Sequence, residues 1–154
     1  MEAVINMARQ FARESHIRNI LEGEWTFMID DSGKRLPGIR GRAGVAMPTL
    51  EGIEVGADLI EMQPGSAFPL HTHPGEHILY VIQGKGYVHV DGIDHSIKEG
   101  DTIYVPAEYA HGVKTDERSA CPFLLLAFGY PHKHIGAEDR MRIVSAGVSS
   151  TKVL

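Results

Sequence analysis

The chain has 154 residues, a net charge of −5 and one cysteine, Cys121, which has no partner for a disulfide within the chain. This length supports a single domain over residues 1–154, and the unpaired thiol is typical of a buried residue in a reducing compartment. The negative charge argues against nucleic-acid binding, and the sequence shows neither a signal peptide nor the roughly 20 apolar residues of a membrane span, so we expect a cytoplasmic protein.

The first predicted element is a helix over residues 3–17. Its apolar and small residues recur every three or four positions, which is typical of an amphipathic helix. They are Val4, Ile5, Ala8, Phe11, Ala12 and Ser15. The basic segment KRLPGIRGR, at residues 34–42, is interrupted by Gly and Pro. We interpret that segment as a solvated loop.

From about Trp25 onward, short runs rich in Val, Ile, Tyr and Thr alternate with Gly, Pro and Asp. Turn signals at intervals of about eight to twelve residues predict an all-β sandwich or barrel. The clearest runs are GIEVGADLIEM, AFPLHTH, HILYVIQ, GYVHVDG, DHSIKEG, DTIYVPA, AHGVKT and PFLLLAFGY. We expect the barrel core at about residues 50–130. For the tail at residues 131–154 the sequence predicts no structure.

Three histidines fall within seven residues, in the segment HTHPGEH. His71 and His73 share one face of an extended strand, because side chains at i and i+2 point the same way. If the next strand pairs with this one, His77 joins them, and His111 is a candidate fourth donor. An isolated HxH pair is more often a surface feature or a satisfied polar pair than a metal site.

The wider spacing resembles the two sequence motifs of the cupin family. The first motif takes in Gly65, His71, His73, His77 and Gly84, and the second takes in Gly100, Pro106 and His111. The resemblance implies a small double-stranded β-helix, or jelly-roll, barrel with a short N-terminal helix. By position it also implies that His71, His73 and His111 bind a metal inside the barrel.

The sequence departs from the cupin pattern at three positions. His77 stands where the family has Glu, while Glu76 should point away from the metal. Glu108 stands where Gly is common, and Thr115 where Asn is common. The site therefore resembles that of small four-histidine cupins, which include manganese proteins with oxidative activity and zinc-containing polyketide cyclases.

Four neutral imidazoles leave the full +2 charge on a divalent ion, which favours substrates that are anionic or easily deprotonated. We expect one divalent ion per chain, with Mn, Fe or Zn favoured over Ni, Co and Cu. Gln63 and water are the candidates for a further ligand. For Gln63, the ordinary role of a turn residue is favoured. The leading hypothesis is an oxygenase of the dioxygenase type that acts on a small enolisable or phenolic compound. A non-redox cyclase or isomerase and a non-enzymatic small-ligand-binding barrel remain open.

Two further predictions concern surfaces. If His77 faces inward, then Ile78, Tyr80 and Ile82 face outward, and a row this apolar predicts a homodimer that buries it. His132 and His134 repeat the HxH spacing after the last strand. Because they lie in a polar tail, we expect both in a solvated loop.

Overall fold

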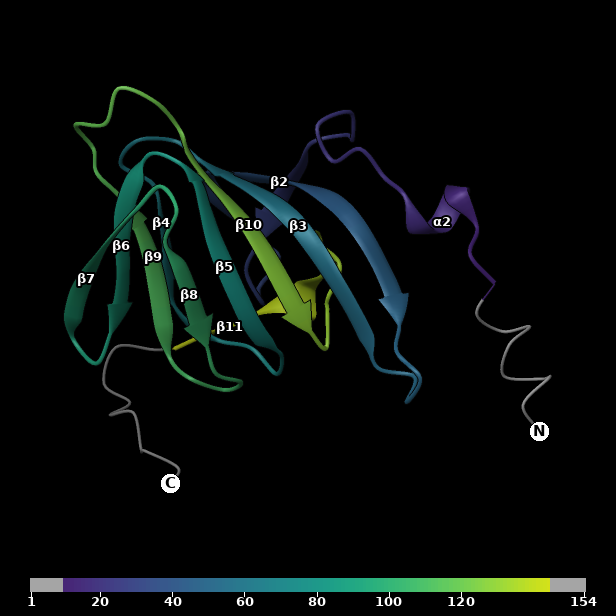
Figure 1. The fold of residues 1–154 in the computed structure, drawn as a ribbon. Helices are drawn as coiled ribbons and strands as arrows, with labels where there is room; N and C mark the ends of the chain where they lie inside the picture. The colour runs from purple at the N-terminus through teal and green to yellow at the C-terminus, as the bar shows by residue number, and fades with distance from the viewer. Residues whose placement is uncertain (1–9, 145–154) are drawn as a thin grey trace.

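The computed structural model describes residues 10–144, and the strands within this range lie in two antiparallel sheets that enclose one core (Figure 1). In order across the first sheet, the strands are β1 (Thr26–Ile29), β2 (Arg35–Pro48), β3 (Glu54–Met62), β10 (Phe123–Tyr130), β5 (Glu76–Gln83) and β8 (Thr102–Val105). In order across the second, they are β11 (Arg142–Ile143), β4 (Ala67–Thr72), β9 (His111–Thr115), β6 (Lys85–Val90) and β7 (Ile93–Lys98). The predicted all-β barrel is confirmed.

Side chains alternate between the inward and outward faces of each strand, and the inward-facing ones form the core. On β10, Phe123, Leu125 and Ala127 are buried, whereas Phe128 on the opposite face is exposed. The Asp91–Gly92 pair adopts positive φ between β6 and β7, as a two-residue hairpin turn requires. Periodicity and turn residues thus position the strands as the sequence predicted.

Only residues 10–17 of the helix predicted over 3–17 can be compared with the structure, and they are helical only in part. Within the described residues α2 spans only Arg13–His16, and residues 3–9 lie outside the described part. None of the α2 residues is buried, and Phe11 is exposed before it. A helix without a buried face gains little from tertiary packing, which explains its short extent. No helix between residues 10 and 144 is long and apolar enough to cross a membrane.

The basic segment at residues 34–42 is not a solvated loop, so that prediction is wrong. Most of it belongs to β2, and Leu36 and Ile39 are buried in the core. Pro37 and Gly38 fall at a register shift in the pairing with β1, where the missing N–H of proline breaks no ladder bond. A bulge therefore accommodates the residues that suggested a loop.

The tail beyond residue 130 closes the barrel as far as it is described. The 3₁₀-helix η1 (Glu138–Arg140) leads into β11, which pairs with β4. Ile135 and Met141 are buried in the common core. The C-terminal segment, defined here as residues 131–144, therefore forms part of the barrel wall.

Candidate metal centre

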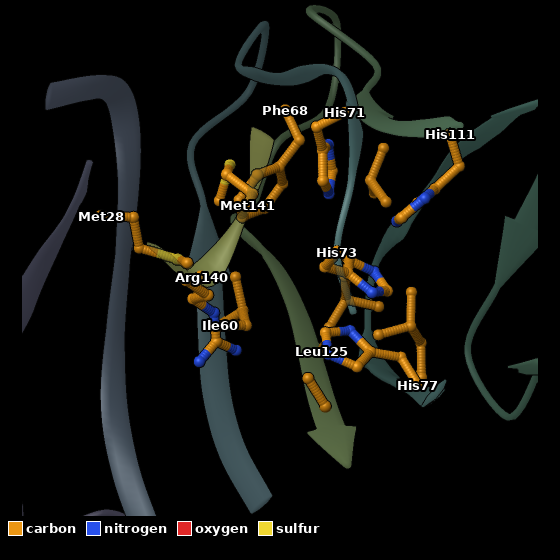
Figure 2. Close-up of a pocket in the computed structure, with 13 residues that line it drawn as sticks. Met28, Ile60, Phe68, His71, His73, His77, His111, Leu125, Arg140 and Met141 are labelled. Carbon is orange, nitrogen blue, oxygen red and sulfur yellow. The ribbon is translucent and has the colours of Figure 1, made fainter. Parts of the chain in front are cut away.

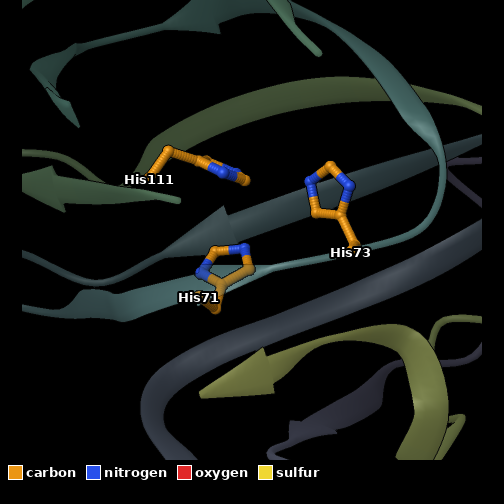
Figure 3. A group of neighbouring side chains, drawn as sticks. All are labelled: His71, His73 and His111. Atoms are coloured by element: carbon orange, nitrogen blue, oxygen red, sulfur yellow. The ribbon is translucent and has the colours of Figure 1, made fainter. Parts of the chain in front are cut away.

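Three of the predicted histidines meet inside the barrel. His71 lies on β4 and His111 opens β9, and the pairing of these strands places the two residues opposite each other. His73 follows the last residue of β4. One nitrogen from each ring lies within 4.8 Å of the others, and all three residues are buried (Figure 3). The strand register thus builds a histidine triad, the name used below for His71, His73 and His111.

Backbone hydrogen bonds orient the triad rings. In each ring Nδ1 lies within hydrogen-bond distance of the carbonyl oxygen of a residue two positions away. The acceptors are Pro69 at 2.7 Å, Gly75 at 2.7 Å and Tyr109 at 2.9 Å for His71, His73 and His111 respectively. A ring that donates from Nδ1 keeps the lone pair of Nε2 for a metal. Among the described residues, the buried Nε2 of His73 has no hydrogen-bond partner, so the site fits a cation.

Burial keeps these rings neutral. It lowers the pKa of His71 to about 3 and that of His111 to about 4. Burial also lowers the pKa of His73, and it lowers that of His77 to about 2. Four imidazoles that stay unprotonated at neutral pH can accept a cation without first losing protons.

His77 lies beside the triad but is not one of its members. Its ring stacks on that of His73, with 3.8 Å between centroids and 19° between planes. The pairing of the two histidine strands, which was the condition for His77 to join the others, does not occur, because β4 and β5 belong to different sheets. The Pro74–Gly75 turn instead carries the chain across the barrel, so His77 approaches from the opposite sheet. Its role as a fourth ligand stays a prediction.

A cavity of about 40 Å³ adjoins the triad (Figure 2). This volume is enough for an ion with a few small ligand atoms. Its polar lining consists of the four histidines and Arg140, and its apolar lining includes Phe68, Leu79, Leu125 and Met141. Gln63 does not line this cavity; it is exposed and donates a hydrogen bond to Glu61, which confirms its interpretation as a turn residue.

Two departures from the cupin pattern leave the loop around the site intact. Glu108 adopts φ +58°, the left-handed conformation that glycine commonly supplies, and its N–H donates to the carbonyl oxygen of His73 at 2.8 Å. Thr115 donates its hydroxyl within reach of the carbonyls of Gln63 and Ser66. Both residues therefore make contacts that hold the loops carrying the candidate ligands.

A buried charge cluster that was not predicted from the sequence lies behind the cavity. Asp58 on β3 is fully buried, and its Oδ2 accepts from Arg140 Nη1 and from His132 Nε2, both at 2.9 Å. The predicted solvated loop is wrong for His132, which is buried between Asp58 and Glu54, and right for His134, which is exposed. The ion pairs with β3 explain why this polar segment leaves solvent.

One signal could have revealed part of the cluster. Asp58 lies on the same inward face of β3 as Gly56, Ile60 and Met62. The two-residue alternation of this strand can be recognised from the sequence. A carboxylate at such a position needs a buried cation. Nothing in the local pattern around Arg140 identifies it as that cation, because the two residues lie 82 positions apart.

Comparison with known proteins gives a family match. Residues 58–127 match the family model of the cupin domain. The chain is 35% identical over 68 residues to an uncharacterized protein of Methanocaldococcus jannaschii, covering 44% of this chain and 53% of that protein. It is 33% identical over 66 residues to an oxalate-binding protein of Thermotoga maritima, covering 42% and 54%. The match spans about half the length of these curated relatives.

Solved structures agree on the fold. The polyketide cyclase RemF from Streptomyces resistomycificus superposes with a TM-score of 0.64 at 16% identity, covering 86% of both chains. An identity this low shows a shared barrel and carries no conclusion about activity. Motif spacing, strand order and family match therefore point to the same kind of domain.

Proposed function

Because this chain belongs to the cupin superfamily, we propose that its barrel holds one divalent metal ion and uses it to act on a small organic substrate. The observation that carries the proposal is the triad of neutral imidazoles whose Nδ1 atoms are engaged by backbone carbonyls. Mn, Fe and Zn are the favoured ions, and imidazole also suits Ni, Co and Cu. His77 would be the fourth ligand.

The first candidate activity is an oxygenase of the dioxygenase type that cleaves a carbon–carbon bond in a small enolisable or phenolic compound. A redox-active ion would supply the activation of dioxygen and draw the deprotonated substrate to the site. The chain contributes an apolar lining around the histidines, which limits the access of water. Phe68 and Leu79 would hold the carbon skeleton of the substrate against the triad.

The second candidate is a non-redox cyclase or isomerase. It is favoured by the composition of the candidate ligand set, which contains no carboxylate and leaves the full +2 charge to polarise a carbonyl. The similarity to an oxalate-binding protein supports a third candidate, a barrel that binds a small ligand without turnover.

Metal analysis followed by an oxygen-electrode screen separates these candidates. Protein purified without an affinity tag is analysed for metal, then reloaded with Mn, Fe or Zn and offered a panel of enols and phenols. Oxygen uptake with Mn or Fe but not Zn supports the oxygenase, and turnover with Zn supports the cyclase or isomerase. Tight binding with no turnover supports the binding protein. Failure to bind any divalent ion would refute the proposed function.

A further inference from the structure

Among the described residues, 10–144, Arg140 is the one permanent cation in the lining of the cavity. The residue is only 7% exposed, and Figure 2 shows it across the cavity from His73 and His77. A guanidinium cannot lose its charge at physiological pH, so it brings a permanent positive charge to an otherwise apolar wall. Such a charge is costly to bury unless anionic or hydrogen-bonding partners surround it.

The partners of Arg140 use only part of its hydrogen-bonding capacity. Among residues 10–144, its hydrogen bonds all come from Nη1, which reaches Asp58 Oδ2 at 2.9 Å and the carbonyl oxygen of Lys133 at 2.5 Å. The N–H groups of Nε and Nη2 have no partner in that range. Guanidinium groups bind carboxylates through two parallel N–H bonds, so these free donors match a second carboxylate.

Asp58 is not an exclusive partner of Arg140. It is shared between Arg140 and His132, and the hydrogen bond to Asp58 raises the pKa of His132. Both nitrogens of His132 contact carboxylates, Asp58 and Glu54, an arrangement that favours the protonated ring. Arg140 therefore shares its one carboxylate partner with a second basic group.

We propose that Arg140 binds a carboxylate group of the substrate, while the oxygen that reacts lies at the histidine triad. This inference rests on the proposed function and narrows its substrate to small carboxylic acids with a second, enolisable oxygen function. Asp58 and His132 position the guanidinium from behind. The small cavity excludes long acyl chains, and the apolar lining contacts the carbons between the two polar ends.

The test uses acetoacetate and its neutral analogue acetoacetamide as probes. Calorimetry measures the binding of both to metal-free and to zinc-loaded protein, since zinc has no redox chemistry that could consume them. We expect acetoacetate to bind about tenfold more tightly, or better, than acetoacetamide, because a hydrogen bond to a charged group is the stronger kind. In the metal-free protein, where no ion attracts the anion, Arg140→Gln should abolish this preference, and Arg140→Lys should retain part of it.

Arg142→Gln is the matched control, since Arg142 is exposed two residues along the same segment and should keep the full preference. If Arg140→Gln fails to fold because Asp58 loses its partner, the double variant Asp58→Asn/Arg140→Gln removes that buried charge as well. Equal affinity of the wild-type protein for both probes, or a preference that survives in the metal-free form of either Arg140→Gln background, would overturn the inference. Zinc binding is measured in a separate titration without either probe, and that titration tests the proposed function. The preference for acetoacetate is also measured in the metal-free protein, so the two proposals can fail independently.

Discussion

At the scale of single residues, the triad shows how a candidate metal site is oriented. Each ring is held by one backbone carbonyl, so its orientation depends on local strand geometry and not on a distant side chain. His77 has a different environment, since it stacks on His73. Residues that match one sequence motif therefore differ in how firmly the structure prepares them as ligands.

Substitutions of His77 test its predicted role. His77→Glu should keep the metal but weaken the binding of an anionic substrate, since the carboxylate lowers the charge of the centre by one unit. His77→Ala should lower metal affinity by about 10- to 100-fold or more, since this loss is typical even of groups that only support a ligand. His71→Ala should lose most of the metal. Metal titration measures each effect, with the exposed His95→Ala as control. Wild-type metal content and substrate affinity in both His77 variants would exclude it from the site.

At the scale of elements, the connection between β4 and β5 brings the two sheets together at the site. The backbone at Gly75 passes so close to the C-terminal segment that a Cβ there would lie 2.4 Å from the carbonyl oxygen of Pro131. Gly75 O also accepts the hydrogen bond from His73 Nδ1 at 2.7 Å. The Pro74–Gly75 turn and the C-terminal segment therefore both help to fix the position of His73.

Gly75→Ala should disturb both the turn and the metal site. One of the two backbones must move, so we expect unfolding in urea to show a loss of roughly 1–3 kcal/mol, the cost of overpacking. Zinc affinity should fall together with this stability, because His73 shifts. Gly23→Ala is the control, since its Cβ would meet nothing closer than 3.8 Å. A Gly75→Ala protein as stable and as zinc-competent as Gly23→Ala would show that the contact is unimportant.

The sequence predicted some elements well and others not at all, for physical reasons. Alternation on β10 is a local property, so PFLLLAFGY could be identified as a strand without its partners. The assignment of β4 and β5 to different sheets depends on pairing across the whole chain. Burial of the C-terminal segment depends on the Asp58–Arg140 ion pair, which joins residues 82 positions apart. Three of the candidate ligands were recognisable because their spacing is local within each motif.

At the scale of the whole molecule, buried neutral histidines make stability depend on pH. Burial lowers the pKa of His71 to about 3 and that of His111 to about 4, below the ordinary value of 6.5. Between pH 6.5 and 4 the unfolded chain binds more protons than the folded one, so stability falls as pH falls, by up to about 1.4 kcal/mol per unit for each histidine. His132 acts oppositely: its hydrogen bond to Asp58 raises its pKa, and its contribution is lost as pH rises through that raised value.

We expect urea unfolding of the metal-free protein to show lower stability at pH 5 than at pH 7. At least two histidines have lowered pKa values, and in this range their effect outweighs that of His132. Metal affinity of the folded protein should hold down to about pH 4 and fall below that value, because only there do protons compete for His111, whose pKa burial lowers to about 4. Constant stability of the metal-free protein from pH 7 to pH 4.5 would contradict the assignment of buried neutral histidines.

The outer face of the first sheet favours assembly. Ile78, Tyr80 and Ile82 point outward as expected, and Ile78 stands between Phe128 and Tyr104 on the neighbouring strands. We propose that a homodimer buries this apolar row. Light scattering at micromolar concentration should give twice the mass of the chain, and Ile78→Lys should reduce it to the monomer mass. Ile93→Lys, at an exposed site on β7, is the control. A monomeric wild-type protein would rule out the dimer.

The central claim is that His71, His73 and His111 bind one divalent ion through Nε2. Anomalous diffraction at the zinc edge, from crystals of zinc-loaded protein, measures this directly. We expect one anomalous peak per chain, at about 2.0–2.1 Å from each of the three Nε2 atoms. No peak at the triad, or a peak bound through Nδ1 after the carbonyl hydrogen bonds have broken, would contradict the account.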